Sequence, residues 1–352
     1  MKNEKPTIII LTPGFPTDET DSTCLPLLQT LLISLKENFP NVNIIILSFE
    51  YPFFKGTYKW HGFDVVSLNG YNKRKLFRLI LWREALKQLK NIYTRNKVIG
   101  LLSLWCGECA WIGKKFSRKH NLKHYCWLWG QDARKGNKYV SRIRPSANEL
   151  IALSDFLRSE FEKNYSIRSA EVIPPGIDIQ QYKWKNDVRD IDVLGVGSLI
   201  PLKQYNIFVD VIGELRKYFP NIKAVLCGKG PEEYKLQKQI EELGLKKNIT
   251  LAGEVSHQEV IQLMQRSKLL LHTSMYEGFG LVCAEALYAG AHVISFCKVM
   301  NEEILHWYTT NSKEEMIKRA FEILNSSQTE FKPVLAYNIS DTSKQLMKLF
   351  GL

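Results

Sequence analysis

The sequence predicts an α/β protein made of two doubly wound domains, each built on a parallel sheet. The chain has 352 residues, which is enough for two domains with complete hydrophobic cores. Short apolar runs typical of buried strands alternate with helical patterns along most of this length. A rigid Pro-Pro-Gly turn at residues 174–176 precedes a polar, charged stretch at 180–190 that is typical of a linker. We therefore expect a first domain over residues 1–178 and a second that begins at 179.

The composition is that of an ordinary globular protein, with 45% hydrophobic and 24% charged residues. No apolar run approaches the ~20 residues of a membrane span, and residues 8–11 are too few for a signal-peptide core. We therefore expect a cytoplasmic protein. Seven scattered cysteines, an odd number, favour reduced thiols over a disulfide framework. The net charge of +12 favours an anionic partner, which includes nucleic acid, an anionic membrane surface and phosphorylated substrates.

Apolar runs in the first half predict six parallel strands, most of them separated by helices: residues 7–11, 42–48, 98–104, 124–128, 150–153 and 172–173. Ligands of such sheets bind beyond the carboxyl ends of the strands. We therefore expect three loops to contribute to a site: residues 13–23, 105–108 and 129–134.

Residues 72–97 are strongly basic, with nine lysines and arginines against the single acid Glu84 and with apolar residues interleaved. A basic amphipathic helix of this kind can lie on an anionic membrane. It can equally pack on the sheet with its basic face in solvent. Nucleic-acid binding is a third interpretation, although no known DNA- or RNA-binding module is present, and we expect no nucleic-acid partner.

Cys106 and Cys109 form a Cys-x-x-Cys sequence after a predicted strand, as in thioredoxin-type redox proteins. No other element supports such a unit, so two cysteines in an ordinary strand-to-helix turn are the simpler interpretation. Asp190 and Asp192 have the D-x-D spacing of a metal site, but they lie at the amino end of a predicted strand. That is the wrong end for a ligand in this type of sheet, so we predict no metal site.

The second half predicts five more strands, at residues 193–196, 223–227, 248–252, 269–273 and 293–296. The fourth leads into a glycine-rich loop in which Gly278 and Gly280 bracket Phe279, and residues from Leu281 onward favour a helix. A strand, a glycine-rich loop and a helix N-terminus together suit a phosphate or a developing anion. Two carboxylates frame the loop, Glu277 and Glu285; alternatively, the first caps the helix and the second is a surface charge.

The segment Glu277-Gly278-Phe279-Gly280 with Glu285 resembles the E-x7-E signature of retaining GT-B-fold glycosyltransferases of family 4, the group 1 type. The motif order agrees over about residues 192–296, whereas the first domain matches loosely. The resemblance implies two Rossmann-like domains that face a cleft. It also implies an acceptor site on residues 1–178, a nucleotide-sugar site on 179–335, and a C-terminal helix, 336–352, that returns to the first domain.

The resemblance implies a donor site in which Lys203 stabilises the leaving diphosphate, Glu277 binds the sugar and Glu285 binds the ribose hydroxyls. Relatives pair this lysine with an arginine five residues earlier, where this chain has Ser198. They hold the base against the turn that corresponds to Gly253-Glu254-Val255. The expected donor-binding residues are Ser198, Lys203, Gly253, Glu254, Val255, Glu277, Gly278, Phe279, Gly280, Leu281 and Glu285.

Relatives often carry His-Gly-x-Asp near the reacting sugar, where this chain has Trp129-Gly130-Gln131-Asp132. Asp132 and Arg134 are candidates to bind acceptor hydroxyls, although Asp132 could instead cap the next helix. The expected acceptor-binding residues are Gly14, Trp129, Gln131, Asp132 and Arg134. The expected catalytic residues are Glu277, Lys203 and Asp132.

The implied reaction is sugar transfer, with retention of anomeric configuration, from a nucleotide-diphosphate-sugar to a hydroxyl of a glycan or lipid-linked saccharide. We expect no cofactor and no metal, and a peripheral contact with an anionic membrane through residues 72–97. Two alternatives stay open, and the departures of Trp129 and Ser198 from the family pattern bear on the first of them. One is a non-catalytic nucleotide-sugar-binding GT-B protein, and the other is a nucleotide-sugar hydrolase or epimerase.

Overall fold

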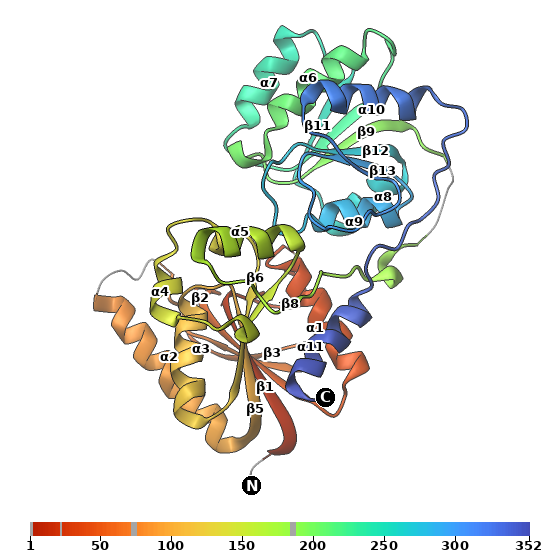
Figure 1. The fold of residues 1–352 in the computed structure, drawn as a ribbon. Helices are drawn as coiled ribbons and strands as arrows, with labels where there is room; N and C mark the ends of the chain where they lie inside the picture. The colour runs from red at the N-terminus through yellow and green to blue at the C-terminus, as the bar shows by residue number, and fades with distance from the viewer. Residues whose placement is uncertain (1–2, 22, 72–75, 184–187) are drawn as a thin grey trace. The chain divides into compact units, whose positions relative to one another are not determined.

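A computed structural model describes residues 3–21, 23–71, 76–183 and 188–352. The chain forms two compact units (Figure 1). Unit 1 comprises Met1–Pro175 and Ile339–Leu352, and unit 2 comprises Gly176–Asn338. The chain thus passes to unit 2 after residue 175 rather than 178, and it returns at 339 rather than 336.

Unit 1 is built on an eight-stranded sheet in the order β3-β4-β2-β1-β5-β6-β7-β8. All neighbours are parallel except β3 and β4, which pair antiparallel as a hairpin. The strands are β1 (Asn3–Gly14), β2 (Asn43–Tyr51), β3 (Gly56–Trp60), β4 (Phe63–Ser67), β5 (Asn96–Leu104), β6 (Lys123–Leu128), β7 (Leu150–Ala152) and β8 (Glu171–Val172). The six predicted strands are present, and the hairpin is an addition that the sequence interpretation missed.

Helices cover the sheet of unit 1: α1 (Pro26–Asn38), α2 (Leu76–Arg95), α3 (Glu108–His120), α4 (Lys138–Ile143), α5 (Asp155–Tyr165) and α11 (Ile339–Phe350). The apolar faces of α2 and α3 pack on central strands through buried side chains such as Leu89 and Ile112. The C-terminal helix α11 lies against α1, where Ser34 and Ser343 are hydrogen-bonded at 3.2 Å (Figure 1). Phe350 of α11 packs edge-on against Tyr125 of β6. The last helix is therefore part of the unit 1 core.

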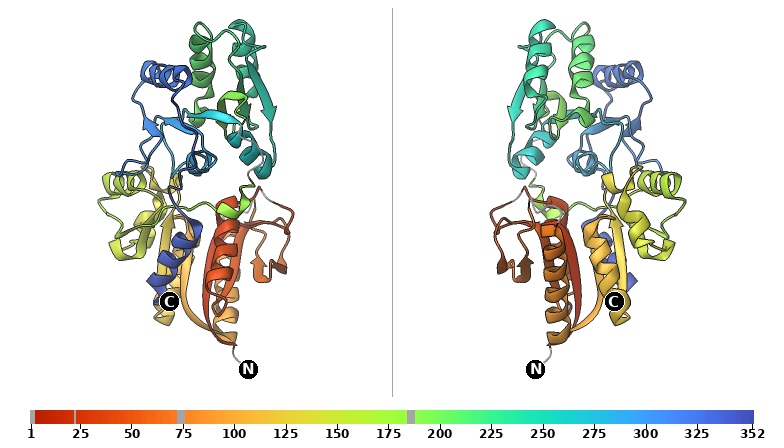
Figure 2. Two further views of the ribbon diagram at one scale, coloured as in Figure 1. Left: turned by 90° about the vertical axis from the view of Figure 1, so that its right-hand side faces the viewer. Right: turned by 90° about the vertical axis from the view of Figure 1, so that its left-hand side faces the viewer.

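Unit 2 is a second doubly wound sheet of six parallel strands in the order β11-β10-β9-β12-β13-β14. Figure 2 shows this unit from two opposite sides, with helices around the strands. The strands are β9 (Ile191–Val196), β10 (Ala224–Cys227), β11 (Ile249–Gly253), β12 (Ser267–His272), β13 (His292–Ser295) and β14 (Trp307–Thr309). The helices are α6 (Tyr205–Leu215), α7 (Glu233–Glu242), α8 (His257–Gln265), α9 (Leu281–Tyr288) and α10 (Lys313–Asn325). The core lies between the sheet and α6, α7 and α10. The five predicted strands are present, and the edge strand β14 was not predicted.

The basic segment is helical from residue 76, whereas residues 72–75 lie outside the described part of the chain. Buried Leu81, Ala85, Leu89 and Ile92 join α2 to the core of unit 1. This favours the packed-helix interpretation for one face of α2. In the described ranges, no helix combines the length and the apolar character that are needed to cross a bilayer.

Candidate active site

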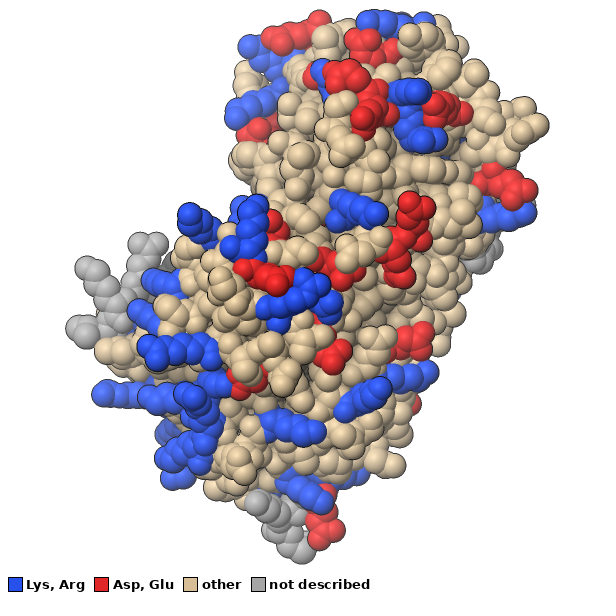
Figure 3. All heavy atoms as spheres, viewed as in Figure 1, with Lys and Arg blue, Asp and Glu red and all other residues tan. Residues whose placement is uncertain are grey.

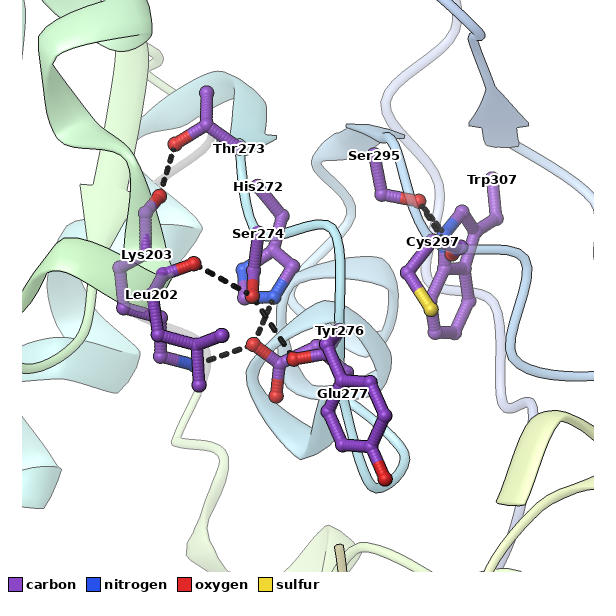
Figure 4. A network of polar contacts seen from close by, with 10 residues as sticks. All are labelled: Leu202, Lys203, His272, Thr273, Ser274, Tyr276, Glu277, Ser295, Cys297 and Trp307. Carbon is purple, nitrogen blue, oxygen red and sulfur yellow. Dashed lines mark hydrogen bonds and ion pairs between the residues drawn. The ribbon is translucent and has the colours of Figure 1, made fainter. Parts of the chain in front are cut away.

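The glycine-rich loop connects β12 to α9, as the sequence indicated. Gly280 adopts the left-handed conformation, with φ of 76°, and caps the helix that starts at Leu281. A side chain would strain this backbone, so glycine allows the sharp turn into the helix. Two hydrogen bonds tie the preceding residues to the segment that follows β9. The Thr273 hydroxyl donates to the Lys203 carbonyl at 2.6 Å, and the Ser274 hydroxyl donates to the Leu202 carbonyl at 3.2 Å (Figure 4). The loop therefore presents the first N–H groups of α9 at a defined place.

Glu277 and Lys203 meet beside this loop, although they are far apart in sequence. The Lys203 ammonium lies 2.5 Å from Glu277 Oε1, and His272 Nε2 lies 2.9 Å from the same oxygen (Figure 4). The histidine contact is close, but it is not aligned as a hydrogen bond. Burial by itself would raise the pKa of Glu277, but His272 and Lys203 outweigh burial and lower that pKa to about 2. Glu277 is therefore a half-buried, paired anion and not a helix cap.

Glu285 is also buried, which excludes the surface-charge interpretation. Only 8% of the residue is exposed, and its Oε1 lies 2.8 Å from His257 Nε2 at the start of α8. The hydrogen bond with Glu285 raises the pKa of His257, against the opposing effect of burial. His257 was not singled out from the sequence, because its only local signal is that it follows the N-cap Ser256. Its partner, 28 residues away, becomes visible only in the fold.

A cavity of about 190 Å³ lies where β9, β10 and β11 end. Its lining includes the predicted residues Ser198, Glu254 and Val255, together with Lys229, which was not predicted. A larger cavity of about 790 Å³ lies between residues 298–310 and α10, and neither cavity has Glu277 or Glu285 in its lining. The smaller cavity is the better candidate for the donor, because it lies at the strand ends where sheets of this type bind ligands.

Two turns beside the smaller cavity are in close contact. The Leu199 N–H donates to the Lys229 carbonyl at 3.0 Å. A Cβ on Gly228 would lie 1.9 Å from the Gly197 carbonyl oxygen, so these backbones approach as only glycine allows. This contact brings Lys229 next to Ser198, the position where the family pattern has an arginine. Both of these residues are exposed.

The carboxylate of Asp132 holds two turns of unit 1 together. Its Oδ2 accepts a hydrogen bond from the Cys106 N–H at 2.8 Å, and its Oδ1 accepts from the Gly130 N–H at 2.8 Å and the Trp129 N–H at 3.2 Å. Burial raises the pKa of Asp132, and these N–H donors act in the opposite direction. Asp132 is thus turned toward the backbone at the ends of β5 and β6.

The turns that Asp132 joins carry two tryptophans. The ring centroids of Trp105 and Trp129 lie 4.7 Å apart at an interplanar angle of 47°. Trp105 has a φ of 61°, a conformation that is unfavourable for an aromatic residue and often found at functional sites. The Trp129 indole nitrogen is buried and has no hydrogen-bond partner in the part of the chain that the structure describes. The predicted loop 105–108 had indicated this region, but not the pairing of the rings.

The remaining acceptor candidates lie at the same edge of the sheet. Gly14 is the last residue of β1, and the exposed Gln131 and Arg134 follow β6. Gln131 and Arg134 are close to Asp132 in sequence, and Gly14 ends a strand that neighbours β5. No described contact shows what these three residues bind.

The redox and D-x-D interpretations find no support in the fold. Cys106 and Cys109 are buried, and burial raises the pKa of the Cys109 thiol well above its usual range, which disfavours a reactive thiolate. Asp190 forms a salt bridge with Arg266, and Asp192 lies 2.7 Å from the Lys268 ammonium, so both carboxylates are already paired. Across the described ranges, no three His, Cys, Asp or Glu side chains are grouped so that they could hold a metal ion.

Residues 177–329, nearly all of unit 2, match the family model of group 1 glycosyl transferases. An uncharacterized glycosyltransferase of Methanocaldococcus jannaschii is 24% identical over 329 residues, a match that covers 89% of this chain and 88% of that protein. Unit 2 is thus similar to group 1 glycosyl transferases, and most of the chain is similar to the M. jannaschii protein. The Anabaena protein HepE, solved with UDP and glucose, has the same fold, with a TM-score of 0.72, 18% identity and coverage of 98% of this chain and 99% of HepE. The predicted fold of two Rossmann-like domains is thereby confirmed.

The gpi3 subunit of the phosphatidylinositol N-acetylglucosaminyltransferase of Schizosaccharomyces pombe is 30% identical over 164 residues. That match covers 45% of this chain and 36% of the relative. The family match contains every predicted donor residue, whereas the acceptor candidates in unit 1 lie outside it.

Proposed function

We propose that this protein transfers a sugar from a nucleotide-diphosphate-sugar to a hydroxyl acceptor with retention of anomeric configuration. The observation that carries the proposal is the Lys203–Glu277 pair beside the N-terminus of α9. A cation and a helix N-terminus suit a leaving diphosphate, and a half-buried carboxylate suits the hydroxyls of the sugar attached to it.

Three positive groups share the diphosphate in this proposal: the Lys203 ammonium, the first N–H groups of α9 and the Lys229 ammonium. Lys229 takes the place of the arginine that Ser198 replaces, because the two turns are in contact beside the cavity. Glu285 binds the ribose hydroxyls, and the hydrogen bond with His257 fixes the orientation of its carboxylate. Lys203 and Glu277 act at the reacting centre, whereas His257 is a positioning residue.

The chemical step breaks the bond between the anomeric carbon and the phosphate oxygen. The leaving phosphate takes the proton of the acceptor hydroxyl, whose oxygen bonds to the same face of the sugar. Glu277 is held as an anion by Lys203 and His272, so it binds sugar hydroxyls and favours the developing positive charge of the ring. This route needs no enzymatic nucleophile and no metal. Activity that is unchanged in excess EDTA would support it, and activity restored only by a divalent cation would contradict it.

The acceptor site that we propose is the edge of unit 1 around Trp105 and Trp129. Aromatic rings suit the apolar face of a sugar, and the rings of Trp105 and Trp129 lie next to each other at this edge. Asp132 positions both turns and is not the base, because its oxygens accept three backbone N–H groups. A lipid-linked acceptor is favoured by the phosphatidylinositol named for the S. pombe relative.

The first experiment is thermal unfolding with UDP-, GDP-, ADP- and CMP-sugars and with the free nucleotides. A ligand at a hundredfold its Kd stabilises the folded protein by about 2.7 kcal/mol, which is a clear shift in Tm. The UDP bound to HepE makes uridine nucleotides the first choice. Binding of one nucleotide class followed by transfer to an acceptor supports the proposal. Binding without turnover would favour the non-catalytic alternative, and release of free sugar without an acceptor would favour a hydrolase.

A further inference from the structure

Unit 1 exposes a group of large apolar side chains at the carboxyl ends of its strands. They come from three segments: the loop after β2, the end of the loop after β4, and the first turn of α2. We call this group the apolar rim, and it consists of Phe53, Phe54, Tyr71, Phe77, Leu79 and Ile80. Phe77 is 65% exposed, and both Phe53 and Ile80 are 57% exposed. Isolated apolar residues on a surface are ordinary, but a contiguous group marks an interaction site.

The three segments of the apolar rim are joined to one another. The rings of Phe53 and Tyr71 lie 4.4 Å apart. The Lys55 ammonium lies 3.2 Å from a carboxylate oxygen of Glu84, which ties the loop after β2 to α2. Gly70 lies so close to Leu81 that an added Cβ would be 2.6 Å from the leucine side chain. The apolar rim is therefore one surface on adjoining backbones.

The first turn of α2 is held with these side chains outward. Arg78 turns inward and pairs with Glu50 and Glu108, and the Trp82 indole N–H also donates to Glu108. Leu81 is buried in the core. Because these neighbours are fixed inside, Phe77, Leu79 and Ile80 cannot turn inward without breaking an ion-pair network that is itself partly buried.

Basic side chains continue the same face of α2. Helical spacing places Arg83, Lys87 and Lys90 on the side of the helix that exposes Ile80. All three are exposed, and over the described residues none lies within 4 Å of a carboxylate oxygen. Figure 3 shows lysines and arginines gathered over this part of unit 1, with few acidic side chains among them. The exposed face of α2 is thus apolar at its start and cationic along its length.

We propose that the apolar rim inserts into the surface of an anionic lipid bilayer while Arg83, Lys87 and Lys90 bind its headgroups. An apolar edge beside unpaired cations is the pattern of interfacial membrane binding. A protein partner with an apolar site would leave the three cations without a role, so the charge pattern favours the bilayer. The proposal deepens the proposed function by placing the acceptor on a membrane, but binding to lipid does not depend on transfer activity.

The test is co-sedimentation of the full-length protein with vesicles of phosphatidylcholine alone and of an equal mixture with phosphatidylglycerol. We expect binding to the anionic vesicles that weakens with salt. The double variant Phe77→Ser/Ile80→Ser should bind at least about tenfold more weakly, because each side chain loses an apolar contact. The variant Arg83→Gln/Lys87→Gln/Lys90→Gln should lose about fivefold per charge at low salt. Tyr234→Ser on α7, at a residue that is 77% exposed, is the control and should bind as the wild type does.

Two further measurements separate this proposal from the others. Each variant should keep its Tm and its thermal shift with UDP, which shows that the fold and the donor site are intact. Equal binding to neutral and anionic vesicles, or wild-type binding by the Phe77 and Ile80 variant, would overturn the proposal. Sedimentation velocity tests whether a second copy of the chain binds the apolar rim. If the wild type is an oligomer and Phe77→Ser/Ile80→Ser is a monomer, the apolar rim is a subunit interface instead.

Discussion

Replacing Glu277 by glutamine tests the centre of the candidate active site, because it removes the charge and keeps the shape. A pKa lowered from 4.5 to about 2 favours the folded, ionised carboxylate by about 3 kcal/mol at pH 7, at about 1.4 kcal/mol for each pKa unit. The side chain is only 13% exposed, so solvent screens this energy little. Glu277→Gln should therefore lower the free energy of unfolding by about 2–3 kcal/mol at neutral pH.

The pH dependence of this loss has a definite sign. A carboxylate whose pKa is lowered by folding stabilises the protein above its unfolded pKa, and this stabilisation disappears as the pH falls toward the folded pKa. For Glu277 the window runs from 4.5 down to about 2. The difference between wild type and Glu277→Gln should thus shrink to about half by about pH 3. Urea unfolding across this range measures it.

The matched control is Glu242→Gln, which removes a carboxylate that pairs with Lys238 at 3.5 Å on the surface of α7. Exposed pairs of this kind contribute little, so the change should stay within about 0.5 kcal/mol at any pH. The reasoning is refuted if Glu277→Gln is as mild as the control at neutral pH, or if its cost does not fall with pH. In a transfer assay, Glu277→Gln should lower kcat more than it raises the donor KM, because the charge matters most when the sugar becomes cationic.

Three more changes test the other parts of the site. Lys229→Ala should weaken binding of UDP about tenfold and leave binding of uridine unchanged. The control Lys223→Ala, at the opposite end of β10, should change neither affinity. Equal losses of affinity for UDP and uridine would contradict a phosphate contact. Glu285→Ala should raise the donor KM about tenfold. His257→Gln should raise the donor KM less and change kcat little. An effect of His257→Gln on kcat alone would argue against a positioning role for His257. Trp105→Ala should raise the acceptor KM about fivefold with the donor KM unchanged, and the reverse pattern in initial rates would remove it from the acceptor site.

Much of the fold could be predicted from the sequence because short apolar runs specify most of its strands. Residues 7–11 and 269–271 are apolar runs of strand length, and both lie in the middle of parallel sheets. The hairpin of β3 and β4 carries no such run, since half-buried and exposed side chains alternate along most of β3 and Asp64 interrupts the buried side chains of β4. Its strands form because β4 pairs with β2, an interaction that the local sequence does not specify.

The candidate site likewise has residues that local spacing selects and residues that only the strand order brings together. Glu277, Gly280 and Glu285 lie within one short segment, so their spacing was enough to select them. Lys229 was missed because its position depends on the pairing of β9 with β10, which brings their two turns into contact. Trp105 was missed as a partner of Trp129 for the same reason, since β5 and β6 are neighbours only in the folded sheet. Strand order, rather than local pattern, decides which loops meet.

The Lys203–Glu277 pair also explains how the site can stay charged when no donor is bound. Lys203 is 18% exposed, and a cation so enclosed is costly without a partner. Glu277 supplies that partner, while His272 contacts the same carboxylate oxygen (Figure 4). In the proposed reaction, Lys203 would turn to the arriving diphosphate, because His272 still neighbours the carboxylate that the ammonium leaves. Glu277 would then accept hydrogen bonds from the donor sugar. Under this proposal the lysine and the glutamate need each other before the donor binds, and each would bind a different part of the donor afterwards.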